Sequence, residues 1–161
     1  MATRSAIGYM TSTGKVRAVY CHWDGYVAGV GRTLQNEYQE ARKIAQLVEL
    51  GDISILDKNI GTKINFDDRE AQSTNEQCLF YGRDRGEANT ETREFETVGD
   101  FVEHYESAGC EYYYLRTSYG YWIYHDRYTA GKDALGYAMF DFLEPAVLNE
   151  VERLRAMGYE V

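Results

Sequence analysis

Short apolar runs separated by small polar residues mark the beginning of the chain, a pattern typical of β-strands. Apolar side chains dominate residues 5–10 and 16–21, and the segment between them contains Gly14 and small polar residues. A loop of three to five residues with a glycine favours a hairpin. We therefore expect the chain to begin with two paired strands.

Helical spacing follows, because apolar residues recur at steps of three and four between Leu34 and Val48. The pattern fits either one long helix or two shorter ones separated near Gln39, with Gly51 after the end. Asp52 is positioned to cap a short turn over 53–56. A long polar loop over 57–76 and a third strand over 77–81 complete the first half.

The second half predicts one helix, an aromatic hairpin and two further helices. Thr97 is positioned as the N-cap of a helix over 98–107, and strands over 111–117 and 121–127 flank a glycine turn. Helical patterns over 134–142 and from Pro145 onward end the chain. In all, we expect an α+β fold in the order ββα(α)βαββα, with a mostly antiparallel meander sheet of about five strands covered by helices.

Composition indicates a single domain over 1–161. The chain has 44% hydrophobic residues and one proline, and no segment resembles a linker. Three widely spaced cysteines do not form a disulfide framework and fit a reducing compartment. No apolar stretch approaches the ~18 to 20 residues of a membrane span, and the first residues lack the apolar core of a secretory signal.

Charge is distributed unevenly along the chain. The net charge is −9, of which residues 61–161 carry −10 and residues 1–60 carry +1. Such a field repels nucleic acids and anionic membranes and attracts basic partners. Direct binding of nucleic acid is therefore disfavoured.

The strongest charge feature is the stretch from Glu87 to Glu111, which contains eight acidic residues and one arginine. A block of like charge is usually a solvated surface, but here it would also imitate nucleic-acid phosphates. Fifteen tyrosines exceed the needs of the core, so some are expected at a protein interface or between copies of this chain. The candidate partner-binding residues are Glu87, Glu91, Glu94, Glu96, Asp100, Glu103, Tyr113, Tyr119 and Tyr121.

A second candidate site combines two short motifs. His22, Trp23, Asp24 and Tyr26 follow the second strand, where a turn or a small-ligand pocket is expected. Arg83 and Arg85 flank Asp84 between two glycines, as in a clamp for a phosphate or carboxylate or in a charged surface turn. The motifs would form one site only if the second and third strands are neighbours.

No arrangement of residues indicates catalysis or metal binding. Cys21 and His22 are adjacent on a strand, so their side chains point to opposite faces. His22, His104 and His125 lack the spacing of a zinc site. We predict no catalytic set, no metal and no cofactor.

Several segments resemble a group of small proteins encoded by tailed bacteriophages. The most specific is the stretch Tyr-Cys-His-Trp-Asp-Gly-Tyr over 20–26, and matches continue over 1–5, 29–31, 50–54 and 81–87. Relatives commonly have proline after the last tyrosine, where this chain has Val27. The resemblance covers about the first half of the chain, carries no catalytic residues, and implies an accessory protein in the bacterial host cytoplasm.

Two hypotheses of function follow. The first is a non-enzymatic host-takeover or anti-defence protein, which binds and inhibits a host protein through an acidic, tyrosine-rich surface. That host protein would handle nucleic acids or act in defence, and would offer a basic groove. The alternative is a small-ligand protein that binds, sequesters or cleaves a nucleotide-derived signal in a pocket near Trp23 and Arg83.

Overall fold

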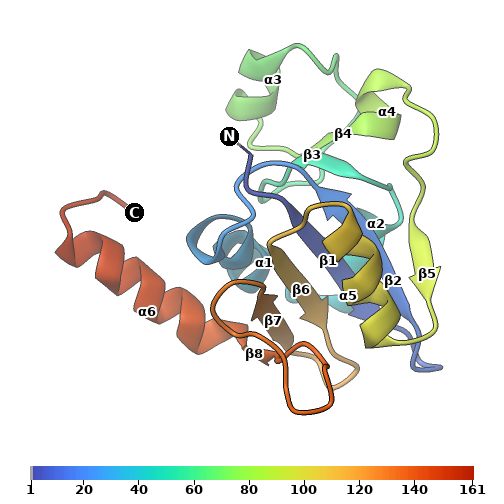
Figure 1. The fold of residues 1–161 in the computed structure, drawn as a ribbon. Coiled ribbons are helices and arrows are strands. Elements are labelled where there is room, and N and C mark those ends of the chain that lie inside the picture. Colours follow the sequence, from blue (N-terminus) through green and yellow to red (C-terminus); the bar gives the residue numbers. More distant parts are fainter. Residues whose placement is uncertain (1) are drawn as a thin grey trace.

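The computed structural model describes residues 2–161 and shows a mixed β-sheet between two helical layers (Figure 1). In chain order the elements are β1 (Ser5–Met10), β2 (Val16–Cys21), the π-helix η1 (Val27–Gly31), α1 (Arg32–Glu37), α2 (Ala41–Val48), β3 (Ile53–Ile55), α3 (Arg69–Thr74), β4 (Leu79–Phe80), α4 (Tyr81–Arg85), β5 (Arg93–Phe95), α5 (Val98–Ser107), β6 (Tyr112–Arg116), β7 (Trp122–Asp126), β8 (Asp141–Phe142) and α6 (Leu143–Ala156). The α+β class is confirmed.

The sheet differs from the expected meander in size and in order. Within residues 2–161 it has eight strands in the order β4-β3-β2-β1-β6-β7-β8, and β5 pairs with the free part of β2. The pairs β1–β6 and β2–β3 are parallel, whereas the other pairs are antiparallel. The helices between β2 and β3 return the chain to the same end of the sheet, which makes that pair parallel.

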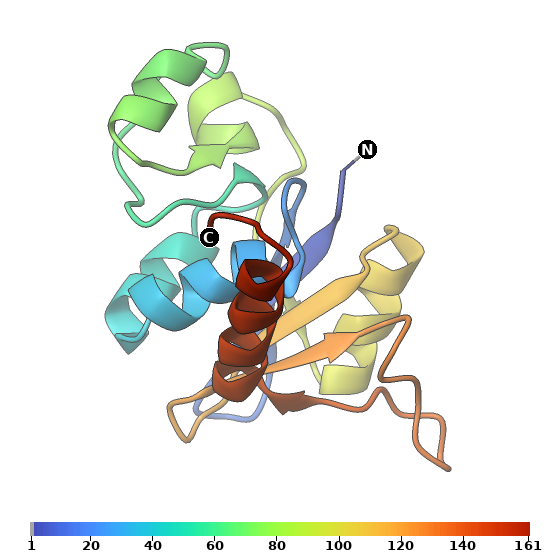
Figure 2. The same ribbon diagram turned by 90° about the vertical axis from the view of Figure 1, so that its left-hand side faces the viewer.

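Alternation along the strands distributes the core over both faces of the sheet. Ile7 and Val19 belong to a cluster covered by η1, α1, α2 and α6, whereas Ala6 and Ala18 belong to a cluster covered by α5. A quarter turn of the molecule shows these two layers on opposite sides of the sheet (Figure 2). On its face α5 is the one helix of the layer within the described residues, and Phe95, Ala138 and Phe140 pack beside it.

Local signals predicted several elements with their boundaries. β1, β2 and α5 have the expected limits, and the Thr97 side chain accepts a hydrogen bond of 3.1 Å from the Asp100 backbone N–H. The hairpin of β6 and β7 is confirmed, as is the alternative of two helices separated near Gln39. None of the helices in residues 2–161 combines the length and apolar character needed to cross a membrane.

The expected helix over 134–142 is wrong. Lys132 pairs with Ala138 in a narrow hairpin, and β8 follows directly. The Asp133 side chain accepts hydrogen bonds from the backbone N–H groups of Leu135 (2.9 Å) and Tyr137 (3.0 Å), which stabilises the turn. Gly136 has a positive φ of 85° in this turn, so turn chemistry prevails over the apolar spacing. We call residues 127–140 the arm.

Candidate functional site

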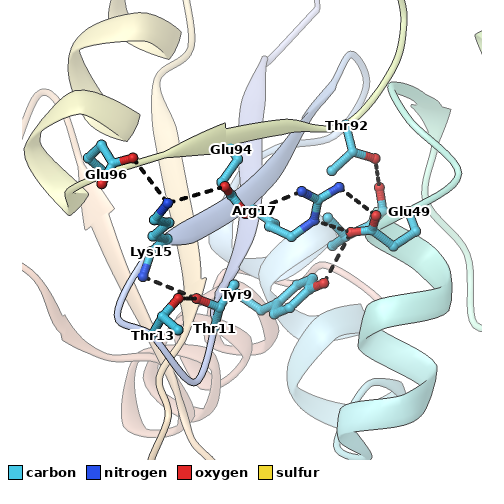
Figure 3. A network of polar contacts seen from close by, with 10 residues as sticks. Tyr9, Thr11, Thr13, Lys15, Arg17, Glu49, Thr92, Glu94 and Glu96 are labelled. Carbon is cyan, nitrogen blue, oxygen red and sulfur yellow. Dashed lines mark hydrogen bonds and ion pairs between the residues drawn. The ribbon is translucent and has the colours of Figure 1, made fainter.

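The predicted acidic residues separate into neutralised and free groups. Lys15 Nζ lies 3.2 Å from a Glu96 oxygen and 3.8 Å from a Glu94 oxygen, and Arg17 reaches Glu94 at 3.4 Å (Figure 3). Arg17 also donates two hydrogen bonds of 2.6 and 2.7 Å to Glu49, which lowers the pKa of that carboxyl. Glu94 and Glu96 thus join β5 to the start of β2, and Glu49, at the end of α2, joins that helix to β2.

Glu87 and Glu91 lie outside that network, on the segment that leads into β5. Arg85 donates a hydrogen bond of 2.6 Å to Glu87, so this carboxylate is also neutralised. Glu91 is exposed. Charge counted along the sequence therefore overstates the free negative charge of this stretch.

Besides Glu91, the predicted acidic stretch has free carboxylates on α5. Among residues 2–161, Asp100, Glu103 and Glu106 form no ion pair. They line one wall of a groove of about 920 Å³ between α5 and the arm, whose opposite wall contains Tyr137 and Phe140. We call this hollow the α5 groove. Its volume is typical of a binding site.

The base of the arm is held by buried contacts on the α5 side of the sheet. The buried His125 ring lies 2.7 Å from the Met139 carbonyl oxygen through Nδ1, and a carbonyl only accepts, so Nδ1 carries the proton. The rings of His125 and Phe140 are 5.6 Å apart. These contacts position the second wall of the α5 groove.

The arm itself extends away from the sheet (Figure 2). Residues 127–137 are all exposed, and the exposed fractions of Tyr128, Leu135 and Tyr137 are 71%, 81% and 61%. Exposed apolar side chains on a continuous segment mark an interaction surface. The arm and α5 thus form one candidate site for a partner.

Of the three tyrosines predicted to bind a partner, one is buried and two are exposed. Tyr113 is fully buried and its hydroxyl donates a hydrogen bond of 2.8 Å to the Cys110 carbonyl, so its assignment to a partner-binding surface is wrong. Tyr113 faces α5 on the sheet, and this packing direction removes it from the surface. Tyr119 and Tyr121 are exposed and stacked at 6.5 Å, but they lie at the turn of the β6–β7 hairpin, away from the α5 groove.

The motif after β2 forms a structured turn. The hydroxyl of Tyr20 lies 2.7 Å from His22 Nδ1, and the His22 and Trp23 rings meet edge to face at 4.8 Å. Burial lowers the pKa of His22. Asp24 adopts a positive φ of 57°, and its carbonyl accepts a hydrogen bond of 2.8 Å from the Val30 N–H. Tyr26 alone among the four motif residues lines one of the described cavities.

The second predicted motif stabilises a loop. The Arg83 guanidinium donates hydrogen bonds to the carbonyls of Ile60, Gly61 and Cys78. The buried Asp84 carboxylate accepts from Arg83 and from two backbone N–H groups. These bonds occupy Arg83 and Asp84 and leave the guanidinium few donors for an anion.

The two motifs are also separated by a strand. The expected third strand, seen as β4, pairs with β3, and β3 lies between it and β2. The condition for a single site, that the second and third strands are neighbours, is therefore not met, because residues 53–55 form a strand between them instead of the expected turn. Arg85 packs over the Phe66 and Tyr81 rings at 4.8 and 5.1 Å.

Sequence reasoning missed Glu106, Lys132, Tyr137 and Phe140 as residues of the α5 groove. Gly131, Asp133 and Gly136 are turn residues within a few positions of each other, and this signal could have indicated the arm. Comparisons of the chain with protein-family models, with curated proteins and with solved structures gave no match.

Proposed function

We propose that this chain is a non-enzymatic binding protein whose α5 groove holds a basic segment of a partner protein. The observation that supports this proposal is that one wall of the α5 groove is acidic and the other is aromatic. Asp100, Glu103 and Glu106 present free carboxylates on one wall, and Tyr137 and Phe140 present aromatic rings on the other, beside one lysine, Lys132. Lysine or arginine side chains with an adjacent apolar residue complement both walls.

The groove geometry makes charge pairs effective. Pairs formed between the arm and α5 would be partly shielded from water, and the effective dielectric constant there is lower than in solvent. Tyrosine supplies contact area with little loss of side-chain entropy. The exposed Tyr128 and Leu135 extend this contact area along the arm.

The resemblance to bacteriophage proteins and the charge of −10 over residues 61–161 suggest the class of partner. A host protein that handles nucleic acids or acts in defence offers a basic groove of the required charge. A basic segment of that region held in the α5 groove would no longer be open to nucleic acid, and the partner would be inhibited. The chain would then act as an accessory protein of infection in the host cytoplasm.

The test compares two triple variants of equal charge in affinity capture from a bacterial host lysate. One variant reverses the charge of the α5 wall of the groove through the substitutions Asp100→Lys, Glu103→Lys and Glu106→Lys. Glu70→Lys, Glu152→Lys and Glu160→Lys make the same change of net charge at exposed positions outside it. We expect the groove variant to lose a stoichiometric partner, with affinity reduced about 100-fold or more, while the control variant retains it.

Salt dependence and fold provide the checks. Binding of the wild type should weaken between low and moderate salt because screening reduces exposed charge attraction. Circular dichroism should show that both variants remain folded. Equal loss in both variants, or a partner held equally well by the groove variant, would contradict the proposal, as would the absence of any specific partner.

The alternative of a nucleotide-derived ligand near Trp23 and Arg83 has less support. Arg83 and Asp84 are occupied by the loop over 60–64 and by β4, and β3 separates them from the turn that contains Trp23. An anionic ligand would need free cationic groups in that place. The occupied arginine and the intervening strand therefore disfavour a nucleotide site at this place.

A further inference from the structure

A second cavity, on the opposite face of the sheet from the α5 groove, has a different lining. It measures about 630 Å³ and lies between η1, the β6–β7 hairpin and α6. Its walls contain the rings of Tyr26, Tyr112 and Tyr124 and the carboxylates of Asp126 and Glu150. We call this cavity the tyrosine pocket.

Strand register produces the aromatic wall. Tyr114 pairs with Tyr124 and Tyr112 pairs with Asp126 across the two strands, so all four side chains are on one face of the sheet. The Tyr112 and Tyr114 rings stack at 6.4 Å with an interplanar angle of 8°, and Tyr114 and Tyr124 stack at 6.5 Å and 23°. The ladder thus has a buried middle ring and two outer rings that open into the pocket.

Tyr114, the middle ring of the ladder, attaches the start of η1, the opposite wall of the pocket, to the sheet. The Tyr114 hydroxyl donates a hydrogen bond of 2.7 Å to the Gly25 carbonyl, just before η1. A Cβ atom at Gly31 would lie 3.1 Å from the Tyr114 ring, so the absence of a side chain there allows η1 to approach the sheet. Tyr26 on one side and the outer rings on the other are therefore held at a constant separation.

The pocket is electronegative. Burial first, and then Asp126, Glu111 and Glu150, raise the pKa of Tyr112 to about 12. Burial also raises the pKa of Tyr124, followed by Asp141, Asp126 and Glu150. Arg153 pairs with Glu150 at 2.5 Å. Asp126 forms no ion pair with any residue of the described range 2–161. One uncompensated carboxylate thus lies among aromatic rings.

We infer that the tyrosine pocket binds a small organic cation that carries an ammonium or guanidinium group. Aromatic faces attract cations through their quadrupole, and quaternary ammonium groups are recognised by several rings together. The Asp126 carboxylate supplies the opposite charge and accepts hydrogen bonds from N–H donors. Anionic ligands are disfavoured because Arg153 is already paired.

The test is isothermal titration of the intact chain with choline, agmatine and spermidine, and with 3,3-dimethylbutan-1-ol as the uncharged counterpart of choline. We expect at least one cation to bind with one-to-one stoichiometry and the alcohol to bind about tenfold more weakly or not at all. Asp126→Asn preserves shape and the hydrogen bond from the Tyr128 N–H, and should weaken cation binding about tenfold.

Matched variants distinguish cation binding in the tyrosine pocket from attraction by the net negative charge of the protein. Glu152→Gln removes one charge from an exposed position of α6 and should leave binding unchanged, whereas Tyr124→Leu should weaken it. The groove variant with Asp100, Glu103 and Glu106 changed to lysine should also bind normally, so this inference and the proposed partner function fail separately. The absence of binding by all three cations, equal binding of the alcohol, or unchanged affinity in Asp126→Asn would each overturn the inference.

Discussion

Asp52 connects separate parts of the sheet through its side chain and its backbone. Its carboxylate accepts a hydrogen bond of 3.0 Å from the Tyr20 N–H on β2. Its carbonyl accepts from the Tyr81 N–H, and its own N–H donates to the Thr90 carbonyl. Burial raises the pKa of this carboxyl to about 6, although the Tyr20 bond and Arg93 act in the opposite direction.

The raised pKa predicts a pH dependence of stability. Folded Asp52 keeps its proton at pH values where the unfolded chain has lost it, so this stabilisation is complete below about pH 4 and is lost as the pH rises through 6. Asp52→Asn retains the acceptor for Tyr20 but does not titrate. Relative to wild type, its free energy of unfolding should rise by about 1 kcal/mol between about pH 5 and pH 7, after allowance for solvent screening.

Urea denaturation of both proteins at the two pH values measures this difference. Glu152→Gln is the control, because its carboxylate is exposed on α6 and should give the same difference from wild type at both values. If Asp52→Asn also shows no change between the two pH values, the carboxyl titrates in the folded chain as it does in the unfolded chain.

At the scale of elements, glycine allows η1 to fold against the turn that precedes it. A Cβ atom at Gly29 would lie 2.3 Å from the Asp24 carbonyl oxygen, which is a backbone atom with little freedom to move. The same carbonyl accepts the hydrogen bond from the Val30 N–H. The glycines after Tyr26 thus serve the close approach of two backbone segments.

Two glycine substitutions should therefore have opposite effects. Gly29→Ala should lower the free energy of unfolding by about 2 kcal/mol or more, because the added methyl group forces the backbone apart. Gly99→Ala should raise it by up to about 1 kcal/mol, because the position is helical and the nearest atom, Thr97 Oγ1, is 3.7 Å from the added Cβ.

Chemical denaturation of the two variants beside wild type provides the measurement. Their far-ultraviolet circular dichroism shows whether the native fold is retained before the free energies are compared. A Gly29→Ala protein as stable as wild type would mean that η1 can move away from Asp24 at no cost.

At the scale of the whole molecule, the arm contains the longest uninterrupted run of exposed residues within 2–161. Residues 127–137 are exposed without interruption, whereas the chain on both sides belongs to the sheet or to α6. Cleavage by proteases is favoured in exposed segments with few tertiary contacts. The molecule thus combines a covered sheet with a projecting contact surface.

Limited proteolysis should cut the arm first. We expect chymotrypsin to cleave after Tyr128, Leu135 or Tyr137, and trypsin to cleave after Arg127 or Lys132, while the two fragments remain associated through β7, β8 and α6. Mass spectrometry identifies the first cuts, and size-exclusion chromatography tests the association. Initial cleavage in the loop over 57–68 instead would show that this loop opens more readily than the arm.

Local structure followed from the sequence wherever neighbouring residues determine it. The limits of β1, β2 and α5 were predictable because apolar period, a glycine turn and the Thr97 cap all act within a few residues. Leu148 shares the apolar helical spacing of Val147 and Val151, yet its exposed fraction is 60% whereas those two residues are buried. Periodicity indicates which residues share a face but not how much of that face is covered.

The candidate sites depended on contacts between distant parts of the chain. Sequence concentrated negative charge between Glu87 and Glu111, but the fold placed Lys15 and Arg17 beside Glu94 and left the α5 carboxylates free. The tyrosine pocket likewise combines residues from positions 26 to 154. Composition and short-range pattern determined the α+β class, the acidic field and the surplus of tyrosine. Tertiary structure decided which charges and rings remain open to a ligand, because neutralisation and burial depend on neighbours that strand pairing brings together.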